Sequence, residues 1–249
     1  MLEFLNPKLA DIPRLRELWK EAFSDEDSFL DRFFGSVFDT DHALVLKEDG
    51  KIVSALYIID CEFKGKKLGY IYSVATDKAS RGQGFATKLL EHSDEYMKKC
   101  GYSAAILRPA SSELFGFYEK LGYDITLRKD RVETVAEGFC EIEKISTEEY
   151  AEIRVKLAPD GAVLQSGAVL DLMDADLYRG EGFLLAAEER GGALYAEEFL
   201  GNHEMLAAIT AALGFERGYF NCVGNSLPFA LLKNYSLTEI PDYFGLAIE

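Results

Sequence analysis

The sequence has few of the residues from which metal centres and disulfide frameworks are built. Its four cysteines are widely scattered and include no CxxC pair, and its three histidines include no two at ligand spacing. These absences argue against a zinc site, another His-based metal site or a set of disulfides. They favour reduced thiols in a cytoplasm, and we expect no bound metal.

Two further absences concern membranes and export. No apolar run approaches the roughly 18 residues that are needed to cross a bilayer. The first residues, MLEFLNPKLADIPR, lack the basic start and the apolar stretch of a secretory signal. We therefore expect a cytoplasmic protein without a membrane partner.

Positive charge is also scarce, because 27 lysines and arginines stand against 43 acidic residues, which gives a net charge of −16. Such a surface repels nucleic-acid phosphates, so no nucleic-acid partner is expected. It attracts a cationic small molecule or a basic peptide, although solubility alone also accounts for an acidic surface. The 249 residues, 48% of them apolar, suffice for one large domain or two smaller ones.

Helical and alternating apolar patterns predict a series of helices and strands in each half of the chain. In the first half, helices are expected at 8–23, 27–37, 84–100 and 112–121, and strands at 42–47, 52–63, 68–75, 103–107 and 123–127. In the second half, Ser146 or Thr147 begins a helix. Strands then follow at 183–188, 193–199, 219–223 and 243–248, with helices at 203–213 and 226–234.

The order strand, strand, helix, strand, helix, strand occurs in both halves. In addition, Ser112-x-x-Phe115 aligns with Ser226-x-x-Phe229. This repetition predicts two copies of one fold, with domains at 1–140 and 141–249. Two unrelated α+β halves are the alternative interpretation.

A glycine-rich turn, Arg81-Gly82-Gln83-Gly84-Phe85-Ala86, joins the expected strand 68–75 to the helix after it. A helix N-terminus preceded by glycines is suited to bind phosphate through backbone amides. The sequence does not fit a P-loop or a Rossmann fingerprint, because Thr87 stands where each motif requires a glycine. A tight turn without a ligand is the alternative.

The same turn resembles the acyl-CoA signature R/Q-x-x-G-x-G/A of the GCN5-related N-acetyltransferases (GNAT), with Arg81, Gly84 and Ala86 at the defining places. The segment LFGFYEKLGYDI at 114–125 resembles the F-Y-x-x-x-G-F/Y segment of that family. The resemblance covers about residues 1–130. It implies the GNAT fold, an α/β (α+β) mixed sheet that would occur in tandem in this chain, and acetyl-CoA as the co-substrate.

The resemblance also assigns roles to particular residues. Tyr118 aligns with the tyrosine that protonates the leaving thiolate, and the N–H of Val74 would stabilise the thioester oxygen. Packing in the apolar face of FGFYEKL is the alternative role of Tyr118. The general base is open among Asp60, Glu113, the α-carboxylate of Glu249 and water. The expected cofactor-binding residues are Val74, Ala75, Thr76, Arg81, Gly82, Gln83, Gly84, Phe85, Ala86 and Ser112.

The second half lacks R-x-x-G-x-G/A between Phe199 and His203, and Leu232 aligns with Tyr118. We therefore expect a degenerate copy that serves as a scaffold or as a wall of the acceptor cleft, with one cofactor per chain. The expected function is transfer of acetyl from acetyl-CoA to a primary amine of a cationic small molecule or peptide, by direct attack in a ternary complex. The alternative is a catalytically silent acyl-CoA-binding module that regulates a partner.

Overall fold

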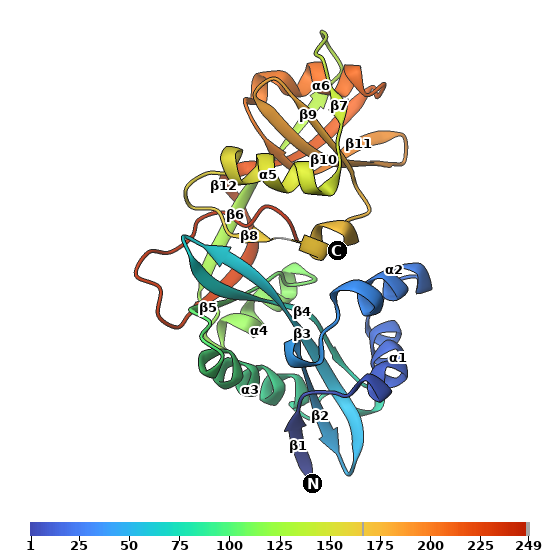
Figure 1. The fold of residues 1–249 in the computed structure, drawn as a ribbon, viewed down its shortest axis with the longest axis vertical. Coiled ribbons are helices and arrows are strands. Elements are labelled where there is room, and N and C mark those ends of the chain that lie inside the picture. The colour runs from blue at the N-terminus through green and yellow to red at the C-terminus, as the bar shows by residue number, and fades with distance from the viewer. Residues whose placement is uncertain (166, 248–249) are drawn as a thin grey trace. The chain divides into compact units, whose positions relative to one another are not determined.

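Strands dominate the computed structural model, which describes residues 1–165 and 167–247 (Figure 1). The pairing of the strands is partly parallel and partly antiparallel, so the expected mixed α/β architecture is confirmed. The chain divides into two units, each with its own core. The first comprises Met1–Ile125 and Leu231–Thr238, and the second comprises Thr126–Ala230 and Glu239–Glu249.

The sheet of the first unit has the order β1-β2-β3-β4-β5, followed by the last residues of β12. Its members are β1 (Leu2–Leu5), β2 (Ala43–Glu48), β3 (Lys51–Phe63), β4 (Lys66–Thr76), β5 (Ala104–Leu107) and β12 (Arg217–Asn234). Neighbouring strands are antiparallel except β4 and β5, which are parallel. β12 enters this unit at Leu231, which pairs with Leu107.

Helices cover both faces of this sheet (Figure 1). The helices are α1 (Ile12–Ala22) and α2 (Asp27–Arg32), followed by a π-helical turn (Phe33–Val37), on one face, and α3 (Phe85–Lys99) and α4 (Phe115–Glu119) on the other. The two faces follow from alternation along β3, because Tyr57 contacts Trp19 of α1 whereas Leu56 belongs to the core under α3. Short 3-10 helices lie at Leu9–Asp11, Thr40–His42, Lys78–Ser80 and Ser112–Leu114.

The second unit repeats part of this plan. Its sheet has the order β12-β11-β10-β9-β7, and β6 pairs with β12. β11 and β12 are parallel and are separated in sequence by α6, as β4 and β5 are by α3. The elements are β6 (Ile125–Val135), β7 (Glu143–Lys144), α5 (Thr147–Leu157), β8 (Leu164–Gln165), β9 (Asp176–Gly180), β10 (Phe183–Arg190), β11 (Ala193–Leu200) and α6 (Leu206–Ala212), with 3-10 helices at Gly167–Leu172 and His203–Met205.

The end of the chain corrects two expectations. Residues 226–234, expected as a helix, continue β12, because a short buried apolar run fits the interior of a sheet as well as a helix. The strand expected at 243–248 is not found among the described residues of that range. Tyr243 forms only an isolated bridge with Ala162, and Ile248 lies outside the described residues. The alignments of Ser226 with Ser112 and of Leu232 with Tyr118 are therefore lost.

The division of the chain also differs from the expected domains at 1–140 and 141–249. The boundary falls between Ile125 and Thr126, at the start of β6, and the chain returns to the first unit at Leu231. A strand that continues from one unit into the next has no linker composition, so this boundary is not visible in the sequence.

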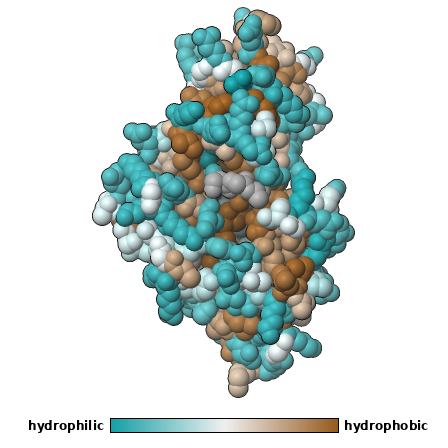
Figure 2. Space-filling view, viewed as in Figure 1, coloured by the Kyte–Doolittle hydropathy of each residue, from teal (hydrophilic) through white to brown (hydrophobic). Residues whose placement is uncertain are grey.

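The surface is mostly hydrophilic in the view of Figure 2, where separate apolar patches interrupt the polar residues. Among the described residues, no helix combines the length and the apolarity needed to cross a bilayer. Four charged side chains of the described residues are nevertheless buried: Asp94, Lys129, Arg154 and Glu198. Buried charge is costly without partners, so these groups mark constrained positions in the two units.

Candidate functional site

The turn between β4 and α3 has the backbone conformation that its glycines predict. Gly82 and Gly84 have φ of +78° and +75°, in the left-handed region that glycine adopts without steric cost. Gly84 is the N-cap of α3, and no described side chain caps the helix there. The first N–H groups of α3 therefore lack partners within the helix, and a Cβ at either glycine would enter open space. This arrangement is suited to an anion.

Two side chains hold the turn in place. Arg81 donates from Nε to the carbonyl oxygen of Thr76 (3.0 Å) and from Nη2 to that of Glu21 (3.1 Å). Asp77 caps the 3-10 helix that follows β4 and pairs with Arg14 of α1. The hydrogen bond from Arg14 lowers the pKa of the Asp77 carboxyl, so this side chain stays ionised. No sequence motif predicted the Arg14–Asp77 ion pair. Arg81, which the signature predicted as a cofactor-binding residue, bonds to backbone carbonyl oxygens and so fixes the backbone of the turn.

The carboxyl end of β4 has no neighbouring strand on one side. Its parallel pairing with β5 ends at Ile71 and Leu107, whereas β4 itself continues to Thr76. No other described strand pairs with this edge, so its backbone can pair with an extended ligand. The expected cofactor-binding residues Val74, Ala75 and Thr76 all lie in this segment.

A bulge at Ser73 distorts the same strand, and nothing in the sequence signals it. Ser73 has φ of +50°, which is uncommon for a residue with a side chain. The register with β3 shifts at this point, since Ala55 faces Ala75 but Tyr57 faces Tyr72. The Ser73 hydroxyl is buried and has no hydrogen-bond partner among the described residues. Backbone strain and an unpaired buried polar group at one position are typical of functional sites.

Tyr118 of α4 lies in the core cluster that the start of α3 also enters. The cluster contains Phe85, the first residue of α3, and Val74 packs against it. Tyr118 is 9% exposed, and burial raises the pKa of its phenol to about 12. Its hydroxyl has no hydrogen-bond partner in the described part of the chain. Phe85 and Tyr118 thus belong to one core cluster against which Val74 packs, and the phenol of Tyr118 is protonated and unpaired at neutral pH.

Several other predicted residues of this site are more exposed than Tyr118. Gln83 and Ser112 are exposed, and Ala86 is half-buried in the first turn of α3. Ser112 begins the 3-10 helix that leads directly into α4, so one short helical segment sets its distance from Tyr118. Of the candidates for the base, Glu113 is exposed, and Glu249 lies outside the described residues.

An aromatic cluster covers β3 and β4 beside the bulge, on the face opposite Tyr118. Trp19 lies 4.7 Å from Phe33 and 5.2 Å from Tyr57, measured between ring centroids. Tyr72, which immediately precedes the bulge, lies 5.5 Å from Trp19. The indole N–H of Trp19 donates to the carboxylate of Asp25 (2.6 Å). Trp19 is 1% and Tyr72 8% exposed, so the rings pack on one another and Asp25 is the charged group beside the cluster.

Asp60 lies too far from the bulge to be the general base. It pairs across the hairpin with a residue five positions before Val74, which is about 17 Å along β4. Its carboxylate accepts from the Tyr102 hydroxyl and pairs with Lys67 (3.0 Å). Asp60 therefore belongs to a polar cluster at the opposite end of the hairpin.

The corresponding region of the second unit is filled by its own side chains. The pairing of β11 with β12 is interrupted between Ala196 and Phe199. Within this interruption Glu198 is completely buried and pairs with Arg154 of α5. The side chain of Asn202 caps the 3-10 helix after β11 through the N–H of the second following residue (3.1 Å). Among the described residues, this unit therefore has no counterpart of the open glycine turn.

Comparison with known proteins identifies the family of the first part of the chain. Residues 5–126 match the family model of the acetyltransferase (GNAT) domain. This part of the chain therefore belongs to the GNAT acetyltransferase family. No curated protein sequence matches the chain significantly.

Solved structures share the fold over nearly the whole chain. A GCN5-related N-acetyltransferase from Kribbella flavida has a TM-score of 0.72 at 15% identity, covering 93% of this chain and 70% of that one. A probable N-acyltransferase from Enterococcus faecalis V583 has a TM-score of 0.71 at 14% identity, and the match covers 94% of this chain and 73% of that one. Eis1 from Mycobacterium abscessus has a TM-score of 0.68 at 11% identity, and the match again covers 94% of this chain and 73% of that one. The likeness extends well beyond residues 5–126, so the second unit is part of the shared fold.

Replacing Gly84 with alanine is expected to weaken coenzyme A binding by about tenfold or more. The added Cβ enters the space beside the open amides, and at φ of +75° the side chain also disfavours the backbone conformation of the turn that presents them, by about 1–2 kcal/mol. Gly101→Ala is the matched control, because Gly101 ends the same helix with φ of +81° and is also surrounded by open space. Calorimetric titration should show normal affinity in the control, and an equal loss in both variants would contradict the role of the turn.

Stability is expected to fall in alkaline solution because buried tyrosines resist ionisation. The pKa of the Tyr118 phenol is about 12 in the folded chain and about 10 in the unfolded chain. The contribution of this tyrosine to the free energy of unfolding is therefore complete below about pH 10 and is lost as the pH rises to about 12. Each such tyrosine steepens the fall by up to about 1.4 kcal/mol per pH unit. Urea unfolding at several pH values measures this, and Tyr118→Phe should show a shallower fall. Identical slopes would contradict the burial of this phenol.

Proposed function

We propose that the chain is an acetyl-CoA-dependent N-acetyltransferase that acetylates a primary amine without a metal. One observation carries the proposal. Phe85 at the start of α3 and Tyr118 with its unpaired phenol belong to one core cluster, and Val74 of the open edge of β4 packs against that cluster, within the region that matches the GNAT family model. A turn that served packing alone would need neither the open strand edge nor the phenol.

The residues present fit acetyl-CoA as a substrate. The backbone amides of 82–86 would receive the pyrophosphate at the N-terminus of α3, where the helix dipole favours negative charge. Val74, Ala75 and Thr76 would pair through their backbone with the amides of the pantetheine arm, as an added strand does. Gln83, Phe85 and Ser112 complete the proposed contacts, while Arg81 keeps the turn in place.

The proposed chemistry is direct attack of the amine on the thioester carbonyl. The new N–C bond forms, the C–S bond breaks, and the N–H of Val74 stabilises the negative charge that develops on the carbonyl oxygen. Tyr118 donates its proton to the leaving thiolate, which its raised pKa of about 12 permits because the phenol is protonated at neutral pH. The amine loses its proton to solvent water, from which Tyr118 regains one.

The acceptor is proposed to be cationic, either a small molecule or a basic peptide. The net charge of −16 attracts cations to the molecule. At the site, the ring of Tyr72 precedes the bulge, and Trp19 with its partner Asp25 lies against that ring. An ammonium group would pair with the half-buried carboxylate of Asp25, since the rings of Trp19 and Tyr72 are almost fully buried.

The second unit is proposed to be a degenerate copy that supports the first. The run β9-β10-β11-α6-β12 repeats β2-β3-β4-α3-β5, and the last two strands of each run are parallel. Its bulge is filled by the pair Arg154–Glu198 instead of being open. We therefore expect one acetyl-CoA per chain, bound by the first unit.

The test is release of free thiol from acetyl-CoA in the presence of a panel of amines. Spermidine, an aminoglycoside and a lysine-rich peptide represent the proposed acceptor classes, and a neutral alcohol of similar size is the control. Amine-dependent release, with the acetylated amine identified by mass spectrometry, would support the proposal. Slow release that no amine accelerates would instead indicate a catalytically silent acyl-CoA-binding module.

A further inference from the structure

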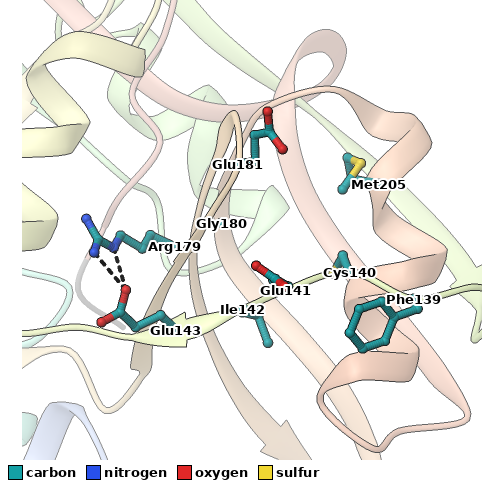
Figure 3. A pocket seen from close by; sticks show the side chains of 9 residues that line it. All are labelled: Phe139, Cys140, Glu141, Ile142, Glu143, Arg179, Gly180, Glu181 and Met205. Atoms are coloured by element: carbon teal, nitrogen blue, oxygen red, sulfur yellow. Dashed lines mark hydrogen bonds and ion pairs between the residues drawn. The ribbon is translucent and has the colours of Figure 1, made fainter.

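A groove in the second unit contains none of the residues of the candidate site. Its volume is about 650 Å³. Residues 139–143, which lead into β7, form one wall, and residues 179–181, at the end of β9, form another (Figure 3). Met205, just before α6, completes it. The groove therefore lies where three segments of the second unit converge.

One side of the groove is apolar, and Phe139 is its exposed member. Phe139 is 81% exposed, although phenylalanine is among the residues that are most often buried. Cys140 and Ile142 follow it along the wall, and Figure 3 shows Met205 on the same side of the groove as Phe139. An exposed ring beside further apolar side chains is typical of a surface that binds another molecule.

The other lining groups carry an excess of negative charge. Arg179 is neutralised, because it bonds Glu143 (2.7 Å) and also pairs with Glu149 (2.8 Å). Glu141 and Glu181 line the same groove and have no ion-pair partner in the described part of the chain. An occupant that brings positive charge would therefore pair with these two carboxylates, whereas an acidic one would be repelled.

The backbone beside the groove offers a third contact. β7 is the last strand in the order of this sheet, and it pairs with β9 through Glu143 and Lys144. No described strand pairs with its other edge. An extended peptide can add to such an edge through main-chain hydrogen bonds, with alternate side chains directed to one face.

We propose that this groove docks an extended basic segment of a partner protein. Lysine or arginine side chains of the segment pair with Glu141 and Glu181, and a large apolar side chain contacts Phe139. The three features select this occupant together, since a small cation would leave the apolar side uncovered and a neutral peptide would leave the carboxylates unpaired. The interaction is independent of acetyl transfer.

The test is fluorescence anisotropy with the labelled peptide KVKFKVK at about 0.15 M salt, where weak long-range attraction is screened. We expect saturable binding that Glu141→Gln with Glu181→Gln weakens by about tenfold, and Phe139→Ser by a similar factor. Glu152→Gln with Asp171→Asn is the matched control, because both side chains are exposed and lie outside the groove. It removes the same charge and should change the dissociation constant less than about twofold.

Four outcomes would overturn the proposal, the first three of which concern the peptides and the variants. These three are the absence of saturable binding, equal effects of the groove and control variants, and equal affinity for KSKSKSK, which keeps the charge but lacks apolar residues. Displacement of the peptide by spermidine at matched charge would assign the groove to small cations and would also overturn it. Circular dichroism checks that each variant is folded.

Discussion

Replacing Tyr118 with phenylalanine is expected to lower kcat for amine acetylation by about 100- to 10,000-fold, the usual contribution of a positioned general acid. The phenol donates only as the C–S bond breaks, so KM for acetyl-CoA should change little. The substitution removes one oxygen that has no partner among the described residues, so the core cluster around it should remain packed. Steady-state kinetics with saturating amine measures the effect.

Tyr123→Phe is the matched control for this experiment. Tyr123 lies in the same core cluster, 6.1 Å from Tyr118 between ring centroids, but its hydroxyl donates to Asp94 (3.4 Å). Its loss should leave kcat within about twofold and cost at most about 1 kcal/mol of unfolding free energy. Equal kcat for wild type and Tyr118→Phe would show that Tyr118 serves packing alone.

Replacing Arg154 with methionine is expected to lower the free energy of unfolding by about 3–5 kcal/mol, because Glu198 would remain buried without its counter-charge. Arg154 is 1% and Glu198 0% exposed, and the guanidinium donates from Nε (2.7 Å) and Nη2 (3.0 Å) to the carboxylate. Burial lowers the pKa of Arg154, but the adjacent Glu198 raises it more, so the guanidinium stays charged. Tyr150 and Tyr243 also donate to this carboxylate. Urea unfolding measures the loss.

Two further variants separate the buried pair from general effects of lost charge. Arg154→Met with Glu198→Gln should recover most of the stability, since a neutral amide accepts from one tyrosine through its oxygen and donates to the other through its nitrogen. Arg179→Met removes a surface arginine of the same unit, which pairs with the carboxylates of Glu143 and Glu149. It should lower the free energy of unfolding by less than about 1 kcal/mol. Similar losses in Arg154→Met and Arg179→Met would contradict the importance of burial.

The first unit could be predicted from sequence because its signals are local. Two glycines at positive φ and a helix of regular apolar spacing define the turn and α3 within about 20 residues. β12 was predicted incorrectly because its second half is defined by pairing with β5, more than 100 residues earlier, and not by its own pattern. The buried run Phe229–Leu232 suits a helix or a strand equally until that partner is known.

The residues of the candidate site could be predicted where they belong to short motifs, and not where they depend on strand pairing. Gly82, Gly84 and Tyr118 belong to short motifs, whereas Ser73 has an ordinary sequence context and its bulge depends on the register between two strands. Buried charge is also invisible in sequence, since Lys233 contacts Asp94 across 139 residues. Side chains that matter through distant partners require the structure, even where the family is evident from a few residues.

The most direct test of the proposed function is calorimetric titration of the full chain with acetyl-CoA. We predict one equivalent bound per chain, because the glycine turn of the first unit is open, whereas in the second unit Asn202 caps the segment before α6 and Arg154 with Glu198 fills the interruption of β11. Binding of one equivalent that Gly84→Ala weakens and Gly101→Ala does not would support it. No measurable binding, or binding of two equivalents, would contradict it.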